Sequence, residues 1–486
     1  MSVTESLAGL GHLINGKIVR NSETFPVLSP STGEVVGYAP DATPELLDQA
    51  VAAAEAALGG WQALGEEARR EAVRALGAAL IENFTPIDNV ESLEKGVQMA
   101  AIELYMAQVY ASHAADTPLP VDIIEDTDER LVRLVRKPVG VVAGISPWNA
   151  PLLIMAEKVF SSLVVGNTIV CKPSPFTPLG TLKVGEVWKD LVPPGVINIL
   201  AGGDELGAAM VSHPGTRLIS FTGSVAAGKK IAEAAGRAMK PAVCELGGND
   251  AAIVLPDVDV KVVAPRLFGA AFLMSGQVCA AIKRLYVHRS IYADMVAELA
   301  GYAQLAKAAP ESEGGTMGPL VTRPQFERVS ELVSEALAGG ARAAAGGGPA
   351  MSSGNYFTPT ILTDAGPGVR VVDEEQFGPV LPVIPFDDAE EAIAAANATE
   401  YGLCGSIWTA DIERGQELAD RLQCGTAWVN NHSEVAPHIP FGGVKSSGVG
   451  RSGGRPGIDG YSNLQSQVTY KGLDRVRGAD NAASGK

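Results

Sequence analysis

The run Gly140-Val141-Val142-Ala143-Gly144-Ile145 decides the fold class, because it is short, apolar throughout and ends at the loop Ser146-Pro147-Trp148-Asn149. Such a run is typical of a strand that is buried on both faces of a parallel sheet. Similar short runs follow it, separated by segments long enough for a helix. They span residues 168–171, 196–200, 217–221 and 241–246. Strands that alternate with helices predict βαβ units and a parallel sheet.

A second series of short apolar runs begins after Gly247-Gly248. Its candidate strands span residues 251–255, 285–287, 380–386, 404–408 and 425–430. We therefore predict an α/β protein with two doubly wound, Rossmann-like domains that meet near Gly247. A helical pattern over 43–80, with Thr43 as its cap and Pro44 in the first turn, precedes both series. The Gly/Ala-rich stretch 338–349 is predicted to be a surface loop.

The bulk properties exclude several classes of function. At 486 residues the chain exceeds the size at which one core stops growing, so more than one domain is expected. Its net charge of −17 disfavours nucleic acid and anionic membrane surfaces, whose phosphates would repel it. No apolar run reaches roughly 18 residues, the first residues lack a basic, apolar signal, and the five cysteines form no metal-binding pair. These features predict a cytoplasmic protein without a metal site.

Cys279 and Glu245 are the candidate catalytic pair. The cysteine lies in Gly276-Gln277-Val278-Cys279-Ala280-Ala281, where small neighbours leave its sulfur approachable, and Glu245 precedes Leu246-Gly247-Gly248. A thiolate can bond to a carbonyl carbon, and a carboxylate can activate the water that breaks that bond. A buried structural cysteine and an ordinary Glu-x-Gly-Gly turn remain the alternative interpretation.

The segment 221–230 contains the end of a strand, a glycine turn and the start of a helix. Gly223 and Ser224 would offer backbone N–H groups and a helix N-terminus to an anion. The segment nearly fits the phosphate loop of nucleotide triphosphatases, but Lys230 stands where Ser or Thr would hold magnesium. It also lacks the Gly-x-Gly-x-x-Gly dinucleotide pattern, so an ordinary βα turn remains an alternative.

Three further loops carry candidate ligand-binding groups. Asn149, held between two prolines, could stabilise a developing oxyanion or simply close a turn. Lys172 follows the next strand, where open α/β sheets bind ligands, and it could donate to ribose hydroxyls or be solvated. The glycine-rich stretch 440–448 is predicted to be a loop against a ligand or neighbouring backbone.

Seven motifs, in this order, resemble the NAD(P)-dependent aldehyde dehydrogenase superfamily. They are Pro147-Trp148-Asn149, Lys172-Pro173-Ser174, Phe221-Thr222-Gly223-Ser224, Glu245-Leu246-Gly247-Gly248, Gly276-Gln277-Val278-Cys279, Glu375-Gln376-Phe377-Gly378-Pro379 and the loop 440–448. The resemblance extends from His12 to Tyr461. It implies oxidation of an aldehyde to a carboxylic acid through a thiohemiacetal and a thioester, which water then hydrolyses.

The resemblance also implies a role for each matched residue. Cys279 would be the nucleophile, Glu245 the base for the hydrolytic water, and Lys158 part of a proton relay. Asn149 and the backbone N–H of Cys279 would form the oxyanion hole. Lys172 would hold the adenosine ribose, Gly223 and Ser224 would face the pyrophosphate, and Glu375 would bind the nicotinamide ribose. The other residues implied to bind NAD or NADP are Ser146, Pro147, Trp148, Ser174, Leu246, Gly247 and Phe377.

The resemblance further divides the chain into domains. An NAD(P)-binding domain would comprise 1–118 and 139–247, and a catalytic domain 248–455. The charged, alternating segment within 119–138 and the segment 456–477 fit neither domain and would form a small β element for oligomerisation. We therefore expect a homodimer or homotetramer, with a mobile tail at 478–486.

Three positions depart from the family pattern. Pro175 stands where many NAD-preferring members have an acid, so NAD and NADP are both expected to be usable. Ser452 replaces a frequent glutamate, which changes the proton route, and Gln465 replaces a frequent lysine.

The positions that line the aldehyde tunnel in this family are often aromatic, but here most are small or polar. These positions are Ala150, Glu157, Leu273 and Val435, with Phe441 retained and His432 and His438 nearby. A wider, more polar tunnel predicts a bulky or functionalised aldehyde, unless a neighbouring loop fills the space.

Three other functions remain as rivals. An acylating dehydrogenase would pass the thioester to coenzyme A, but Glu245 as a hydrolytic base would waste that intermediate. A thiol hydrolase would pair Cys279 with His288 or His432, which leaves the glycine loops unexplained. A binding module could retain the fold without turnover.

Overall fold

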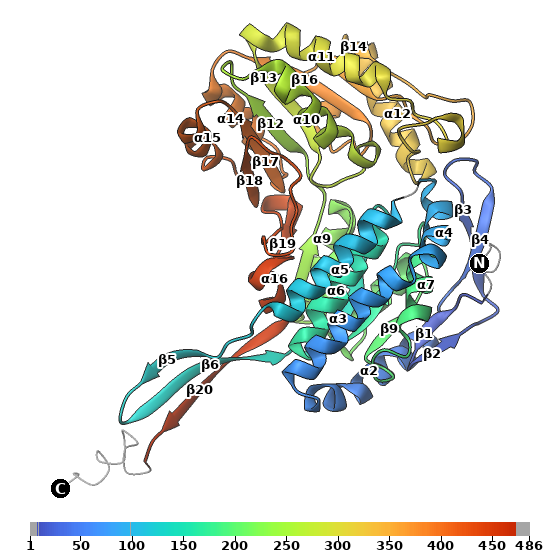
Figure 1. Ribbon diagram of the computed structural model, residues 1–486, viewed down its shortest axis with the longest axis vertical. Helices are drawn as coiled ribbons and strands as arrows, with labels where there is room; N and C mark the ends of the chain where they lie inside the picture. Colours follow the sequence, from blue (N-terminus) through green and yellow to red (C-terminus); the bar gives the residue numbers. More distant parts are fainter. Residues whose placement is uncertain (1–6, 8, 98, 473–486) are drawn as a thin grey trace.

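The computed structural model describes residues 7, 9–97 and 99–472, so the tail predicted to be mobile lies outside the described residues. An eight-stranded sheet forms the lower part of the molecule in Figure 1. Its strands, in spatial order, are β19 (Gly448–Val449), β11 (Ala242–Glu245), β10 (Thr216–Thr222), β7 (Val141–Ile145), β8 (Thr168–Lys172), β9 (Ile197–Ile199), β1 (His12–Ile14) and β2 (Lys17–Val19). The strands from β11 to β9 are parallel, and the outer ones are antiparallel to their neighbours.

Helices cover both faces of this sheet. One face carries α2 (Pro44–Ala63), α8 (Asp204–Ser212) and α9 (Val225–Arg237), and the other carries α6 (Pro151–Val165) and α7 (Leu179–Trp188). A further layer of helices, α3 (Glu66–Glu82), α4 (Phe84–Lys95) and α5 (Ala100–Asp116), packs against α6 and α7 (Figure 1). Successive side chains of a strand point to opposite faces, so Val142 packs under α6 while Ala143 packs under α2. The apolar run at 140–145 is thereby explained.

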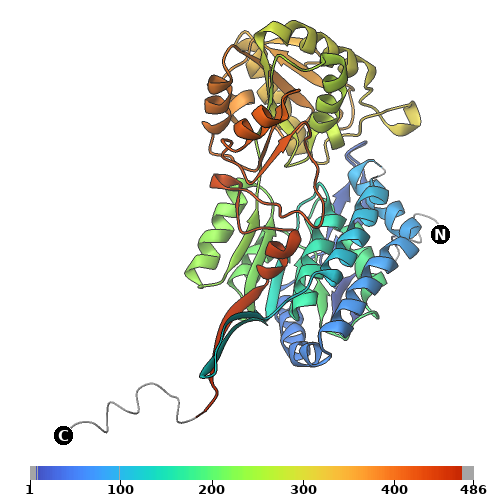
Figure 2. The same ribbon diagram turned by 60° about the vertical axis from the view of Figure 1, so that its left-hand side comes forward.

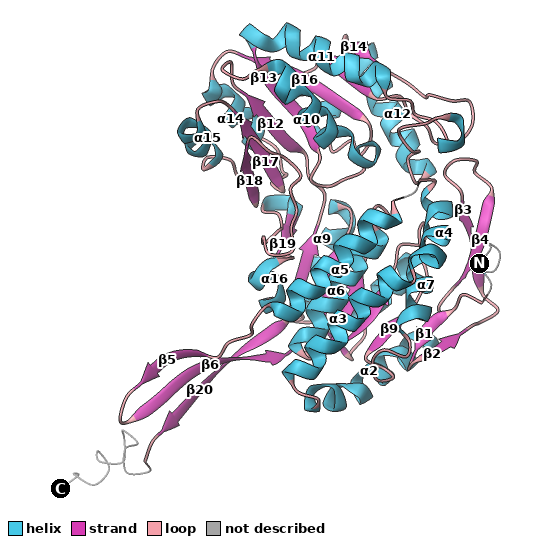
Figure 3. Ribbon diagram, viewed as in Figure 1, coloured by secondary structure: helices cyan, strands magenta, loops and turns pink. Residues whose placement is uncertain are grey.

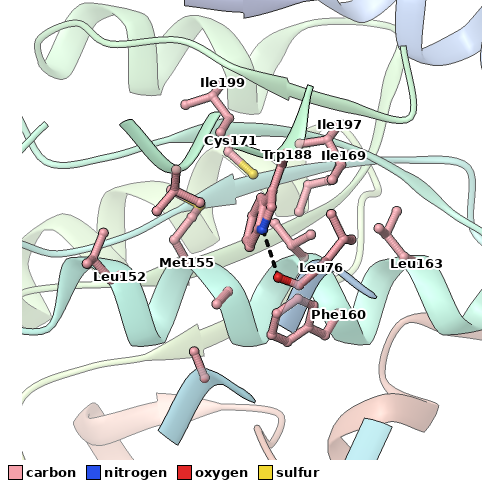
Figure 4. Close-up of a cluster of buried hydrophobic side chains, with 14 of the residues drawn as sticks. Leu76, Leu152, Met155, Phe160, Leu163, Ile169, Cys171, Trp188, Ile197 and Ile199 are labelled. Carbon is pink, nitrogen blue, oxygen red and sulfur yellow. Dashed lines mark hydrogen bonds between the residues drawn. The ribbon is translucent and has the colours of Figure 1, made fainter. Parts of the chain in front are cut away.

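The core beneath α6 contains two large aromatic side chains that pack against each other. The rings of Phe160 and Trp188 have centroids 5.8 Å apart. The indole Nε1 of the buried Trp188 donates to the carbonyl of Leu76 at 3.0 Å, the bond drawn in Figure 4. A buried indole needs such an acceptor, and this one ties α7 to α3.

A second sheet, of seven strands, forms the upper part of the molecule (Figure 3). In spatial order its strands are β14 (Arg342–Ala345), β15 (Thr360–Thr363), β16 (Val380–Phe386), β13 (Ile282–His288), β12 (Asp250–Val254), β17 (Cys404–Trp408) and β18 (Thr426–Val429). All neighbours are parallel except β14. The helices are α10 (Val260–Phe272) and α11 (Tyr292–Leu305) on one face, and α12 (Arg323–Ala338), α13 (Arg370–Asp373), α14 (Ala389–Asn397) and α15 (Ile412–Ala419) on the other. Two doubly wound α/β sheets confirm the predicted fold class.

Two smaller sheets complete the fold. A hairpin of β3 (Thr24–Leu28) and β4 (Val35–Pro40) lies beside the first sheet. A three-stranded ribbon of β5 (Asp122–Asp126), β6 (Arg130–Pro138) and β20 (Ser462–Tyr470) projects away from the body of the molecule (Figure 2). Strand β6 lies in the middle, paired antiparallel with both neighbours. The short helix α16 (Gly454–Asp459) leads into β20.

The structure corrects several details of the sequence analysis. The helical stretch 43–80 is two helices, because Gly65 has a left-handed φ of 84° between α2 and α3. The stretch 338–349 is not only a loop, since it contains the edge strand β14. Residues 448–449, which the sequence analysis assigned to the second domain, pair with β11 of the first sheet. Among the described residues, no helix is long and apolar enough to span a membrane.

Candidate active site

The predicted cofactor residues of the first sheet lie together at the carboxyl ends of its central strands. The register aligns Ile145 of β7 with Lys172 of β8 and with Phe221 of β10, and it aligns Thr222 with Glu245 of β11. The residues that end or follow these strands are Ser146, Pro147, Trp148, Lys172, Ser174, Gly223, Ser224, Leu246 and Gly247. The strand order reverses between β7 and β10, and ligands of open α/β sheets bind at such a reversal.

Two groups at this edge are buried and have hydrogen-bonding capacity to spare. The Oγ of Ser146 has no partner among the described residues. The Nζ of Lys172 donates to the carbonyl of Pro173 at 3.2 Å. Burial lowers the pKa of Lys172 to about 8, and the carboxylates of Asp204 and Asp41 oppose that shift. Buried polar groups normally have partners, so these two are suited to a polar ligand.

The start of α9 presents backbone amides at the same edge. Ser224 caps the helix, because its Oγ accepts from the N–H of Ala227 at 3.2 Å. The neighbouring Gly228 must be glycine, since a Cβ there would lie 2.2 Å from a methyl carbon of Leu246. This close packing brings the helix N-terminus against the turn that follows β11, where it can face an anion.

Glu375 and Phe377 reach the site from the loop before β16. The Oε1 of Glu375 accepts from the N–H of Gly248 at 3.0 Å. A Cβ at Gly247 would lie 2.1 Å from the other carboxylate oxygen, so a larger residue there would displace the Glu375 side chain. The ring of Phe377 meets that of Trp148 edge-on, with centroids 5.3 Å apart. Burial raises the pKa of Glu375 to about 7, with Lys283 as the main opposing charge.

The segment before Cys279 has an unusual backbone. Met274, Ser275 and Gly276 all have left-handed φ angles, of 51°, 56° and 73°. A Cβ at Gly276 would lie 2.1 Å from the carbonyl oxygen of Gly378, so the glycine is required there. The ammonium of Lys283 donates to the carbonyl of Gly276 and holds the turn. Such locally strained backbone persists where the surrounding structure fixes it, and functional sites are common places for it.

Cys279 lies next to the predicted oxyanion-binding residue and the turn after β11. The Nδ2 of Asn149 donates to the carbonyl of Gln277 at 2.9 Å. A Cβ at Gly248 would lie 2.7 Å from the Cys279 carbonyl oxygen. The cysteine is partly exposed. Burial raises the pKa of its thiol to about 12, helped by the carboxylates of Asp250, Glu375 and Glu245 and opposed by Lys283. The resting thiol is therefore protonated.

Glu245 is buried with an uncommitted carboxylate. Neither of its oxygens accepts a hydrogen bond from the described residues. Gly442 approaches so closely that a Cβ there would lie 2.7 Å from Oε1. Burial raises the pKa of Glu245 to about 8, with the ammonium of Lys158 as the largest opposing influence. A carboxylate with these properties can take up a proton near neutral pH.

Lys158 lies on α6, fully buried behind β10. Its Nζ donates to Ser220 Oγ at 3.0 Å and to Thr222 Oγ1 at 2.9 Å. The Ser220 hydroxyl in turn bonds the Tyr461 hydroxyl at 2.8 Å. Burial lowers the pKa of Lys158, and the carboxylates of Glu157 and Glu245 oppose that shift. A chain of proton-bearing groups thus extends from the neighbourhood of Glu245 to Tyr461.

Comparison with known proteins identifies the family to which this chain belongs. The family model described as "Aldehyde dehydrogenase family" matches residues 18–467. The chain belongs to the aldehyde dehydrogenase family. It is 36% identical over 466 residues to the chloroplastic betaine aldehyde dehydrogenase of Atriplex hortensis, with 92% of each chain covered. It is 35% identical over 464 residues to the aldehyde dehydrogenase LUC3 of a Fusarium species, covering 95% of this chain and 98% of that one.

A solved structure gives the same result. The NAD+ complex of the aldehyde dehydrogenase from Bacillus cereus superposes with a TM-score of 0.93 and 33% identity, covering 97% of this chain and 98% of that one. The predicted family, enzyme class and dependence on a nicotinamide cofactor are confirmed. The chain is an aldehyde dehydrogenase.

Three buried residues of this aldehyde dehydrogenase were not singled out from the sequence. Lys283 lies 5.3 Å from the ring centroid of Phe377, and Asp250 accepts from the N–H of Cys404 at 3.0 Å. Tyr461 was named only as the end of the resemblance. A charged residue inside a short apolar run, such as Lys283 or Asp250, was the signal that could have found two of them.

The histidines do not serve as partners of the nucleophile. His432 Nδ1 bonds Ser406 Oγ at 2.8 Å, and its Nε2 lies 3.8 Å from Asp250 Oδ2. His288 bonds Ser290 at the far end of β13. The side chain of His432 is fully buried, so the prediction that it adds polarity to an open tunnel is wrong.

Proposed function

We propose that this enzyme oxidises an aldehyde to a carboxylic acid with NAD+ or NADP+, through a covalent bond to Cys279 that Glu245-activated water hydrolyses. One observation carries the proposal. The carboxylate of the buried Glu245, whose two oxygens have no partner among the described residues, is near enough to the partly exposed Cys279 to raise the pKa of its thiol. The side-chain amide of Asn149 donates to the carbonyl of Gln277, two residues before that cysteine.

The first sheet fits a dinucleotide, and we assign 1–118 and 139–247 to its binding. The unpartnered Ser146 hydroxyl and the spare protons of Lys172 can bind ribose hydroxyls. The amides at the start of α9 can face a pyrophosphate. Glu375 keeps one oxygen free for a further hydroxyl. When bound, the nicotinamide supplies the acceptor for the aldehyde's hydride.

The residues of the second half, 248–455, provide the nucleophile. Burial raises the pKa of the Cys279 thiol to about 12, so the thiol loses its proton only as sulfur bonds to the carbonyl carbon, and water at the partly exposed sulfur accepts that proton. Asn149 has two amide N–H groups, and only one of them is bonded to Gln277. The other can donate to the oxyanion of the thiohemiacetal, together with the Cys279 backbone N–H.

Glu245 and Lys158 then act on the acyl group that remains on Cys279. The free carboxylate of Glu245 can deprotonate a water molecule, which attacks the thioester and releases the acid and the thiolate. Lys158, which donates to the hydroxyls of Ser220 and Thr222, can hold or return a proton close to the Glu245 carboxylate. Transfer to coenzyme A is disfavoured, because a base poised for water would hydrolyse the intermediate first.

A bulky or functionalised aldehyde is the substrate class that we propose. Ala150 and Leu273, which the resemblance places at the aldehyde tunnel, carry no aromatic ring, and Glu157 has a buried carboxyl. The names of two relatives support this choice: the Atriplex hortensis betaine aldehyde dehydrogenase and the Pisum sativum aminoaldehyde dehydrogenase 2, which is 35% identical to this chain.

The test is a kinetic panel of aliphatic, aromatic, hydroxylated and semialdehyde substrates, followed by absorbance at 340 nm with each cofactor. We expect acid formation without coenzyme A and a higher kcat/KM for a larger aldehyde than for acetaldehyde. A requirement for coenzyme A, or no absorbance change with any aldehyde, would overturn the proposed reaction. Acetaldehyde as the best substrate would overturn the proposed substrate class alone.

We also propose that the β5–β6–β20 ribbon is an oligomer interface. Its apolar side chains are exposed, with Ile123, Ile124 and Leu464 each more than half accessible. Apolar patches of this kind mark association surfaces. Light scattering should give a dimer or tetramer mass that falls to the monomer mass in Ile124→Lys.

A further inference from the structure

Four charged side chains of the helical layer are buried far from the reacting groups. Glu91, Glu94 and Lys95 lie on α4 and Glu103 lies on α5, and none is more than 2% exposed. Three acids surround one base, and the Lys95 ammonium bonds Glu103 and lies 3.3 Å from Glu91. Burying such charges is costly, and neither the proposed chemistry nor the apolar core accounts for it.

Two of these acids hold the N-termini of other helices. Glu103 Oε2 accepts from the N–H groups of Leu152 and Leu153, at 3.1 and 3.2 Å, in the first turn of α6. The two oxygens of Glu94 accept from the N–H groups of Leu179 and Gly180, each at 2.8 Å, in the first turn of α7.

Neither helix has a cap of its own. The residues just before α6 and α7, Ala150 and Pro178, make no side-chain capping bond. The first N–H groups of a helix need acceptors, and a negative charge near them is favourable. Glu103 and Glu94 therefore supply caps from distant parts of the chain.

Each capped helix starts directly after a loop of the active site. Asn149 precedes α6 by two residues, and the loop that follows Lys172, the last residue of β8, contains Ser174 and leads into α7. The two loops are joined, because Thr177 Oγ1 donates to the carbonyl of Trp148 at 3.2 Å. The position of each helix start sets where these polar groups lie.

We propose that Glu103 and Glu94 are positioning residues with separate tasks. Glu103 fixes the start of α6 and thereby the amide of Asn149 at the oxyanion. Glu94 fixes the start of α7 and thereby the loop with Ser174 that follows Lys172, at the adenosine end of the cofactor. The inference rests on the proposed roles of Asn149 and Lys172.

The experiment compares three isosteric substitutions in the full-length enzyme. Glu103→Gln should lower kcat about ten- to hundredfold, since small misplacements of catalytic groups have effects of this size. Its Kd for NAD+, measured by calorimetry, should change less than twofold. Glu94→Gln should raise the Kd for NAD+ about tenfold, as expected when about 1.4 kcal/mol of binding is lost, while kcat at saturating cofactor stays within twofold.

Glu91→Gln is the matched control. Glu91 is as deeply buried as the other two acids and lies 3.3 Å from the same Lys95 ammonium, and burial raises the pKa of its carboxyl well above the usual range. It bonds neither helix start, so both kcat and the NAD+ Kd should stay within twofold. If a glutamine variant does not fold, Glu103→Asp and Glu94→Asp keep the carboxyl group but retract it from the helix start, and the same separation of kcat and Kd is expected.

A purely structural role would lower the melting temperature of both variants without separating the two parameters. That outcome, or parallel changes of kcat and Kd in both variants, would overturn the inference. Asn149→Ala separates this failure from failure of the proposed function. If Asn149→Ala retains full kcat, the proposed oxyanion role is wrong; if it loses kcat while Glu103→Gln does not, only the positioning role is wrong.

Discussion

Two glutamates, one on each side of the Gly247-Gly248 turn, differ in what their oxygens contact. Glu375 lies in the loop before β16 and accepts the Gly248 N–H at 3.0 Å. Glu245 ends β11 of the first sheet, and neither of its oxygens has a partner among the described residues. Burial raises both pKa values, to about 7 and about 8. The carboxylate of Glu375, which is already fixed by a hydrogen bond, is therefore suited to hold a ligand hydroxyl. The carboxylate of Glu245, which has no hydrogen bond, is suited to exchange protons with water.

The largest effect is expected from removing the thiol of Cys279, because the proposed reaction begins with its bond to the aldehyde. Cys279→Ala should lower kcat by about 10⁴-fold or more, because the nucleophile is lost. NAD+ binding measured by calorimetry should persist. The matched control is Cys424→Ala, since Cys424 is also partly exposed but bonds only the Thr426 carbonyl. A Cys279→Ala enzyme with more than a trace of activity would end the nucleophile assignment.

The comparison itself predicts different outcomes for the same substitution at the two glutamates. Glu245→Gln should slow hydrolysis of the thioester by about 10²–10⁴-fold, the usual loss for a general base. A fast burst of reduced cofactor should remain, followed by a slow phase, in stopped-flow absorbance at 340 nm. If burst and steady state fell together, Glu245 would have to act earlier, on the thiol.

Glu375→Gln should instead weaken the cofactor. Loss of a charged hydrogen-bonding group costs about 1.5–3 kcal/mol, or about ten- to hundredfold, so the KM for NAD+ should rise by that factor. Reduced cofactor should form without an initial burst, because Glu245 is still present to activate the hydrolytic water. A burst in Glu375→Gln like that of Glu245→Gln would remove the distinction between the two carboxylates.

The pH dependence should identify the uncommitted carboxylate. Glu245 acts as a base only when ionised, and its pKa is raised to about 8. The rate of the hydrolytic phase should therefore rise as pH increases through about 8 and level off above it. Single-turnover rates at pH 6–10 measure this increase, and Glu245→Gln should abolish it. If the rate of the variant still rises with pH, another group is responsible for the pH dependence.

Local patterns in the sequence predicted Cys279, Glu245 and Asn149, because a glycine-flanked cysteine and polar loops after apolar runs are visible in a short segment. The strand β14 was missed, since its Arg342–Ala345 composition resembles a loop and only pairing with β15 makes it a strand. Lys283 and Asp250 were missed because a charge within an apolar run becomes meaningful only once its partner is known. Helix caps that come from distant residues, such as Glu103, leave no local signal at all.

The smallest expected effect concerns the choice between NAD and NADP at the far end of the cofactor site. An acid there accepts two ribose hydroxyls and repels a 2′-phosphate, whereas Pro175 can do neither. Lys172 can pair with a phosphate, but Asp204 and Asp41 lie near enough to raise its pKa and would oppose that phosphate. We expect both cofactors to work within about a hundredfold in kcat/KM, or about 2.7 kcal/mol.

Two substitutions test this expectation. Pro175→Glu should lower kcat/KM for NADP more than for NAD, and Asp204→Asn should raise kcat/KM for NADP. A wild-type preference for NAD above a thousandfold, relaxed by Asp204→Asn, would show that this aspartate rather than position 175 reads the ribose.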